Sequence, residues 1–339
     1  MTDIKSLSPA EIKDLLAELS APSFHAKQIF KWLHSGVSSF DEMTDLSKPL
    51  RRKLSEQCHI TSLRCMKKQV SAMDGTVKYL WALDDGNCVE SVVMCYEHGN
   101  TVCVSSQVGC KMGCAFCAST KKGFVRDLMP SEILDQIIFS QADSGKKISN
   151  IVMMGIGEPL DNFDNVLKFL QLVNDPLGIN IGMRHISLST CGLVDKVDKL
   201  SSYNLQLTLS VSLHAPDNET RSALMPVNNR YDVDSVLAAS ERYFKKTGRR
   251  VSFEYLMADG VNDSEYHAGL LSRKLKGTGS HVNLIPLNEV AESPLHPSSP
   301  GNLKAFTDIL KQNGINVTVR RRLGADIDAS CGQLRYKTI

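Results

Sequence analysis

Three closely spaced cysteines are the residues of this chain best suited to bind a reactive metal centre. Cys110, Cys114 and Cys117 form the pattern C-x3-C-x2-C. A structural zinc site normally closes with four protein ligands, and the sequence has no second C-x2-C or H-x3-H pair. A cubane iron–sulfur cluster held by three thiolates instead keeps one iron open for a small molecule. The spacing therefore favours a 4Fe-4S cluster over zinc or free thiols.

The composition is that of a soluble globular protein. Of 339 residues, 42% are hydrophobic and 22% are charged, and no apolar run approaches the length of about 18 residues that a membrane helix needs. No basic stretch followed by an apolar segment opens the chain, so we expect no secretory signal, no membrane association and a cytoplasmic location. The net charge of +2 neither demands nor excludes a nucleic-acid partner, and any RNA-binding surface would have to come from local basic clusters, such as residues 51–53 and 320–322.

Capping signals predict a small helical module in residues 1–58. Ser8 and Glu11 form a capping box with a proline at the first helical position, and Ser39 and Glu42 repeat the box. Residues 59–100 differ, because Asp-Gly and Gly-Asn pairs separate short β-rich runs there. This second part is predicted to be a β-hairpin meander.

The remaining residues, 101–339, alternate β-rich runs with amphipathic helices such as 131–141 and 303–311. We expect strands at 148–153, 185–189, 207–213, 251–256, 281–285 and 316–320. Such alternation predicts a parallel sheet with right-handed crossovers, which here forms a barrel or partial barrel.

Polar residues gather where these strands end. Gly157 and Glu158 follow the strand at 148–153, Ser189 closes the next strand, and Ser212, Leu213 and His214 close the one after it; Asn288 follows the strand at 281–285. In barrel enzymes, ligands collect at the carboxyl ends of the strands. Glycine permits close backbone approach, and a carboxylate such as Glu158 can accept a cationic amine. The sequence therefore predicts a small-molecule site at this edge of the sheet.

Five motifs make the chain resemble the RlmN family of radical S-adenosylmethionine (SAM) methyltransferases. They are VCVSSQVGC at 102–110, MGIGEP at 154–159, SLSTCG at 187–192, SLHAP at 212–216 and DIDASCGQL at 326–334. The resemblance covers essentially the whole chain, with one departure at Ser330, where many relatives have alanine. It implies an α/β fold, a radical SAM partial (β/α)6 barrel with an N-terminal helical module and a β-hairpin extension. It also implies a dual-specificity RNA (adenine-C2)-methyltransferase that acts on 23S rRNA and tRNA.

The resemblance assigns roles position by position. One 4Fe-4S cluster would be bound by Cys110, Cys114 and Cys117. Cys331 would carry the methyl group as S-methylcysteine, Cys103 would resolve the adduct through a transient disulfide with Cys331, and Glu90 would accept a proton. SAM, used twice per turnover, would contact Gly157, Glu158, Ser189, Ser212, Leu213, His214 and Asn288. A flavodoxin- or ferredoxin-type donor would supply electrons to a monomeric enzyme.

The target carbon explains why such an apparatus is needed. Adenine C2 lies between two ring nitrogens and is electron-poor, so it is a poor nucleophile toward the methyl group of a sulfonium. A carbon radical adds to such a carbon readily, and the cofactor supplies this difficult step.

Other interpretations of these residues remain open at the level of sequence. Without the resemblance, Cys103 would be taken for a core thiol, and His214 and Glu90 for structural or solvated residues. Cys331 differs, because it lies in a polar C-terminal segment where a reactive thiol is more natural. The motifs do not separate RlmN from a Cfr-type enzyme that methylates adenine C8, although the residues around them favour RlmN. A non-catalytic iron–sulfur sensor or RNA-binding protein would need neither the SAM-type loops nor the distant pair of cysteines.

Overall fold

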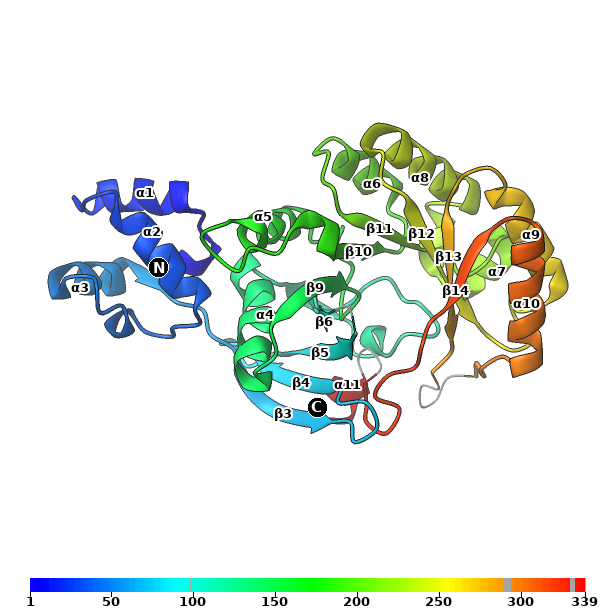
Figure 1. The fold of residues 1–339 in the computed structure, drawn as a ribbon, viewed down its shortest axis with the longest axis horizontal. Coiled ribbons are helices and arrows are strands. Elements are labelled where there is room, and N and C mark those ends of the chain that lie inside the picture. The colour runs from blue at the N-terminus through cyan, green and yellow to red at the C-terminus, as the bar shows by residue number, and fades with distance from the viewer. Residues whose placement is uncertain (98, 289–293, 330–332, 339) are drawn as a thin grey trace.

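One large sheet forms the centre of the structure. The computed structural model describes residues 1–97, 99–288, 294–329 and 333–338. From one edge to the other, the 10-stranded sheet contains β14 (Asn316–Val319), β13 (His281–Pro286), β12 (Val251–Met257), β11 (Thr208–Ser212), β10 (Ile186–Thr190), β9 (Ile148–Met153), β6 (Gly99–Cys103), β5 (Cys88–Tyr96), β4 (Val77–Ala82) and β3 (Arg64–Val70). Figure 1 shows helices along the parallel half of this sheet and the N-terminal helices beyond one end.

The strands from β14 to β6 run parallel and form the predicted partial barrel. Their apolar side chains, such as those of Ile151, Leu188 and Leu209, are fully buried, as expected for strands whose two faces are both covered. In the described part of the chain β14 pairs with β13 alone, so the sheet does not close. The connecting segments contain the helices α4 (Pro130–Ser144), α5 (Phe163–Asn174), α6 (Val194–Ser201), α7 (Asn218–Leu224), α8 (Val233–Thr247), α9 (Glu265–Leu275) and α10 (Pro300–Gln312).

The β-hairpin extension continues the barrel sheet. Strands β3 to β6 pair in antiparallel order, and β6 also pairs in parallel with β9. The last strand of the meander is therefore also the first parallel strand of the barrel. A separate two-stranded sheet, β7 (Gln107–Gly109) with β8 (Phe124–Asp127), brackets the loop with the three cysteines. The C-terminal helix α11 (Gln333–Thr338) lies against β5.

The N-terminal module has its own hydrophobic core. It contains α1 (Pro9–Glu18), α2 (His25–His34) and α3 (Lys48–Gln57), and its ends pair through β1 (Thr2–Asp3) and β2 (Cys58–His59). The predicted capping box is present, since the backbone N–H of Ser8 donates to the Glu11 carboxylate at 2.7 Å. A fully buried ion pair of 2.8 Å between Lys5 and Asp135 fixes the module to α4.

The basic residues 51–53 serve the structure of this module. Arg51 donates to the carbonyl of Asp41 at 2.7 Å, and Lys53 donates to the carbonyl of Leu19 at 2.9 Å. Arg52 pairs with Glu56 along the exposed face of α3. Two of the three cations are therefore committed to the module itself. None of the helices that the structure describes has the length and apolar character that crossing a membrane requires.

Candidate active site

The three cysteines of the C-x3-C-x2-C pattern face one cavity of about 260 Å³. The loop that carries them depends on Gly109, whose φ is +78° and where a Cβ atom would lie 1.8 Å from the carbonyl oxygen of Gly123. The N–H of Cys117 donates to the carbonyl of Cys114 at 3.1 Å. Of the predicted SAM contacts, Gly157, Glu158, Ser189, Ser212, His214 and Asn288 line the same cavity. Leu213 is fully buried and does not line it.

The donor set suits a cluster rather than a single ion. Among the described residues, no three His, Cys, Asp or Glu side chains converge closely enough to hold one metal ion. In a cubane cluster each thiolate binds a different iron. The three cysteine sulfurs must therefore share one cavity, but they do not have to converge on a single point. Burial raises the pKa of Cys110 to about 12, and burial followed by the neighbouring Cys117 raises that of Cys114. Both groups are thiols until a metal centre displaces their protons.

Glu158 is a buried carboxylate held by backbone donors. It accepts from the N–H groups of Leu160 at 3.0 Å and Cys191 at 2.7 Å. Burial raises its pKa, whereas these hydrogen bonds oppose the rise. Gly157, with φ of +109°, leaves no room for a side chain, because a Cβ atom there would lie 2.8 Å from the backbone nitrogen of Gln107. A cationic amine in the cavity would compensate the buried negative charge.

His214 contributes a neutral imidazole to the cavity. Its backbone has φ of +58°, and its Nδ1 accepts from the N–H of Leu256 at 3.0 Å. The acceptor role of Nδ1 places the ring proton on Nε2. Burial lowers the pKa of His214 to about 3, so the ring carries no charge near neutral pH. The ring of Phe116, from the cysteine loop, meets it edge to face at 4.8 Å and joins the loop to the strand ends.

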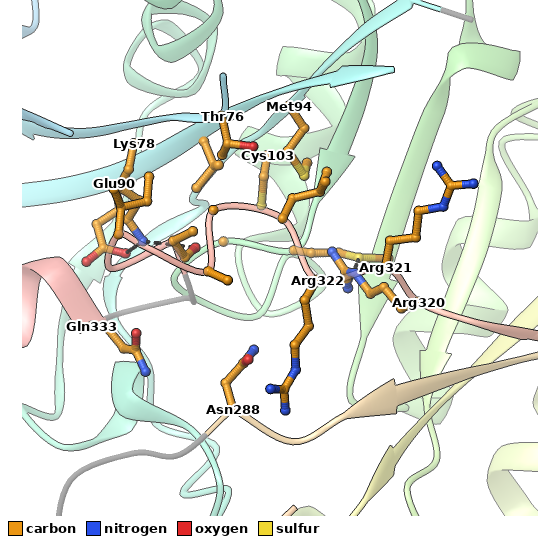
Figure 2. Close-up of a pocket in the computed structure, with 18 of the residues that line it drawn as sticks. Thr76, Lys78, Glu90, Met94, Cys103, Asn288, Arg320, Arg321, Arg322 and Gln333 are labelled. Carbon is orange, nitrogen blue, oxygen red and sulfur yellow. Dashed lines mark hydrogen bonds and ion pairs between the residues drawn. The ribbon is translucent and has the colours of Figure 1, made fainter. Parts of the chain in front are cut away.

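A second cavity of about 400 Å³ adjoins the first and contains Cys103 and Glu90 (Figure 2). The two cavities share the lining residues Met154, Gly155, Ile285, Pro286, Asn288 and Arg320. Cys103 lies opposite Val92 in the β5–β6 pairing, so Glu90, two residues from Val92, faces the same side of the sheet. Burial raises the pKa of the Cys103 thiol, whereas the charges of Arg320 and Lys78 lower it.

Lys78 and Glu90 form a buried ion pair of 2.6 Å in the wall of this second cavity. Their side chains are only 0% and 3% exposed. Figure 2 shows the pair on one side of the cavity and Arg320, Arg321 and Arg322 on the other. The sequence analysis missed Lys78. The sequence does contain a signal for this pair, because Lys78 in β4 and Glu90 in β5 are each the one charged residue of a largely apolar strand.

Cys331 lies outside the described residues, but the chain on both sides of it is anchored near Glu90. The Nζ of Lys78 donates to the carbonyl of Ala329 at 3.5 Å, and the N–H of Arg335 donates to Glu90 at 2.5 Å. Further back, the Asp326 carboxylate accepts from the Ser71 hydroxyl at 2.6 Å and from the N–H of Ala72 at 2.8 Å. The β3–β4 hairpin is therefore a platform on which the C-terminal segment rests.

Comparisons with known proteins agree on one family. A family model described as the radical SAM superfamily matches residues 104–269, and one described as the ribosomal RNA large subunit methyltransferase N-terminal domain matches residues 2–60. The chain is 50% identical to the probable dual-specificity RNA methyltransferase RlmN of Lachnospira eligens, over 99% of this chain and 97% of the relative. The corresponding protein of Lachnoclostridium phytofermentans is 51% identical, over 98% of this chain and 94% of the relative.

A solved structure extends the likeness to three dimensions. The crystal structure of a radical SAM methyltransferase from Sphaerobacter thermophilus superposes with a TM-score of 0.93 at 41% identity, and the match covers 98% of this chain and 99% of the other. The likeness includes the N-terminal module, the extension and the open barrel.

Proposed function

The chain belongs to the RlmN family of radical SAM methyltransferases, and on this basis we propose that it methylates adenine C2 in two kinds of RNA. The substrates would be 23S rRNA, at the peptidyl-transferase centre, and tRNA, at the adenosine 3′ of the anticodon. The observation that carries the proposal is the pair of adjoining cavities. The first cavity contains the three cysteine thiols and Glu158. The second cavity, which shares part of its lining with the first, contains Cys103 and Glu90.

The first cavity would hold the cofactors. Cys110, Cys114 and Cys117 would bind the 4Fe-4S cluster. Glu158 would accept the ammonium group of SAM, and the remaining contacts would come from Gly157, Ser189, Ser212, His214 and Asn288, which line this cavity. When bound, the cluster and two molecules of SAM per turnover would supply a methyl group for Cys331 and a carbon radical. His214 can donate from Nε2 without adding a charge, because its Nδ1 is already an acceptor.

The second cavity would hold the target base and the residues that release it. Glu90, oriented by Lys78 and by the N–H of Arg335, would take the proton from C2 after the carbon radical has added there. The unpaired electron that this addition leaves on the base would return to the oxidised cluster, so that the aromatic ring is restored. The Cys103 thiolate would then attack the sulfur of Cys331 and form a disulfide with it. This attack would break the bond between the Cys331 sulfur and the carbon that has been added to C2. The electron pair of the broken bond passes to that carbon, which takes up a proton to complete the methyl group.

Arginine residues at the cavity support RNA as the substrate. Arg320, Arg321 and Arg322 line the second cavity, and fixed positive charges bind phosphates largely without regard to base identity. The N-terminal module, residues 1–58, would provide a further RNA-binding surface. We also propose that the enzyme acts as a cytoplasmic monomer with a flavodoxin- or ferredoxin-type electron donor.

Mass spectrometry of RNA nucleosides tests the proposal directly. Anaerobically reconstituted protein, supplied with SAM and a reductant, is incubated with unmodified 23S rRNA fragments and tRNA. The expected product from both RNAs is 2-methyladenosine. A product that is 8-methyladenosine would instead identify a Cfr-type activity. Cleavage of SAM to 5′-deoxyadenosine without any methylated RNA would contradict the methyltransferase proposal.

A further inference from the structure

Arg221, in α7, is a fully buried cation whose hydrogen-bond acceptors are all neutral. A guanidinium has five N–H donors, and each of them has a partner here. They donate to the carbonyl of Leu213 at 3.1 Å, the side-chain oxygen of Asn228 at 2.9 Å, and the carbonyls of Tyr231 at 2.9 Å, Cys191 at 2.8 Å and Ser212 at 3.3 Å. Among the described residues, the Asp232 carboxylate attracts the guanidinium only through space, because no hydrogen bond joins the two side chains. The donors are satisfied, but the charge is not neutralised.

The guanidinium joins the ends of two strands that border the first cavity. The carbonyl of Cys191 follows β10, that of Ser212 ends β11, and that of Leu213 comes directly after β11. Gly192 has a φ of +94°, and a Cβ atom there would lie 2.9 Å from Cγ2 of Val236, so the backbone that follows β10 has no room for a side chain at this position. Arg221 therefore fixes the backbone beside Ser189 and His214, two of the predicted SAM contacts.

Arg221 is also tied to the loop that carries the three cysteines. The N–H of Ala115, the residue after Cys114, donates to the carbonyl of Leu224 at 2.9 Å, at the end of the helix that carries Arg221. No other arginine or lysine of the described residues is fully buried beside this cavity without a carboxylate partner.

Burying an unneutralised charge is unfavourable, because neutral acceptors replace only part of the hydration that the ion loses. Anionic groups placed in the cavity would offset this cost. Three thiolates bound to a 4Fe-4S cluster are such groups, and the cluster becomes more negative when it takes up an electron. Net charge and nearby dipoles set the reduction potential of these clusters, and a fixed charge acts strongly in a low-dielectric interior.

We propose that Arg221 is a positioning residue that supplies the counter-charge of the cluster site. It holds the ends of β10 and β11 in place and raises the reduction potential of the cluster bound by Cys110, Cys114 and Cys117. This inference rests on the cluster-binding part of the proposed function. It does not depend on which RNA atom is methylated.

Redox titration of the reconstituted protein, in the absence of SAM and RNA, distinguishes the effect of the Arg221 charge from the effect of its hydrogen bonds. Arg221→Gln removes the charge and keeps an amide donor, whereas Arg221→Lys keeps the charge with fewer donors. In the Gln variant we expect the ratio of reduced to oxidised cluster at a fixed potential to fall about tenfold, a shift of about 59 mV to more negative potential for one electron. The Lys variant should keep the wild-type ratio. Arg242→Gln, the same substitution on the exposed face of α8, is the matched control and should also keep it.

A second variant keeps the proposal testable if Arg221→Gln does not fold. Asn228→Asp places a carboxylate where Arg221 already donates at 2.9 Å, so it should neutralise the guanidinium and lower the potential in the same direction. A wild-type potential in an iron-replete Gln or Asp variant would overturn the proposal. Equal shifts in the Lys and Gln variants would also overturn it, because they would show that charge is not the cause. Since the titration contains no RNA, failure of RNA methylation would not affect either result.

Discussion

Lys78→Met is expected to destabilise the protein far more than removal of a surface lysine. The ion pair between Lys78 and Glu90 is 2.6 Å long, and its side chains are 0% and 3% exposed, so solvent screens it little. Removing one partner of a buried pair typically costs about 3–5 kcal/mol, because the other charge stays buried. Glu90 keeps the N–H of Arg335 at 2.5 Å, so we expect the lower end of this range, about 3 kcal/mol.

A double-mutant cycle isolates the pair. In Lys78→Met/Glu90→Gln the neutral amide still accepts from the N–H of Arg335, and neither partner of the pair leaves its own charge buried. We expect the double variant to recover about 1–2 kcal/mol of the loss. Urea unfolding of the metal-free protein, followed by the fluorescence of Trp81, measures these changes. Trp81 suits the assay because it is buried in β4, the strand that carries Lys78.

An exposed ion pair provides the control for the buried one. Lys304→Met removes an exposed partner of Asp308 one helical turn away, and should leave the free energy of unfolding close to that of the wild type, because solvent screens this pair. If Lys78→Met does not accumulate as folded protein, the double variant should still do so. A Lys78→Met protein that unfolds within about 1 kcal/mol of wild type would refute the reasoning from burial.

Three further predictions concern the site and the response to acid. Cys114→Ala should lose stoichiometric iron and SAM cleavage, measured by iron analysis and by 5′-deoxyadenosine; a variant that retains about four irons per chain and full cleavage would contradict the cluster assignment. Cys103→Ala should accumulate RNA covalently linked to Cys331, because no thiolate can attack that sulfur; the adduct appears as a nuclease-sensitive mass shift, and normal turnover would exclude the resolving role. Burial lowers the pKa of His34 to about 4, so the unfolded state binds more protons between about pH 6.5 and 4, and stability should fall as pH drops through this range. Replacing His34 by Gln should flatten that part of the profile, and an unchanged slope would show that another group is responsible.

Local sequence signals predicted much of the architecture. The six strands expected after the cysteine loop are present, and the structure confirms the open α/β barrel. The capping box at Ser8 and Glu11 also forms, because its hydrogen bonds join residues three apart and need no tertiary contact. The clustering of Gly157, Ser189 and His214 at one cavity follows from the parallel sheet, which brings the carboxyl ends of its strands to one edge.

Other features required the folded chain. The sequence shows residues 51–53 as a basic cluster, but only the structure shows that Arg51 and Lys53 bind carbonyls of their own module. The anchoring of Asp326 on the β3–β4 hairpin joins residues about 250 positions apart, and no local pattern encodes such a contact.

The type and spacing of residues by themselves predicted a metal-binding site and the succession of strands along the chain. Both predictions depend on short-range properties, namely the spacing of three cysteines within eight residues and the periodicity of apolar side chains. Only the tertiary structure decided which charges are buried together. Lys78 meets Glu90 because β4 and β5 pair, and Arg221 reaches the carbonyls of Cys191, Ser212 and Leu213 because two strands end beside α7. The energy of a charge depends on its distance from others and on the dielectric around it, and both exist only after the chain has packed.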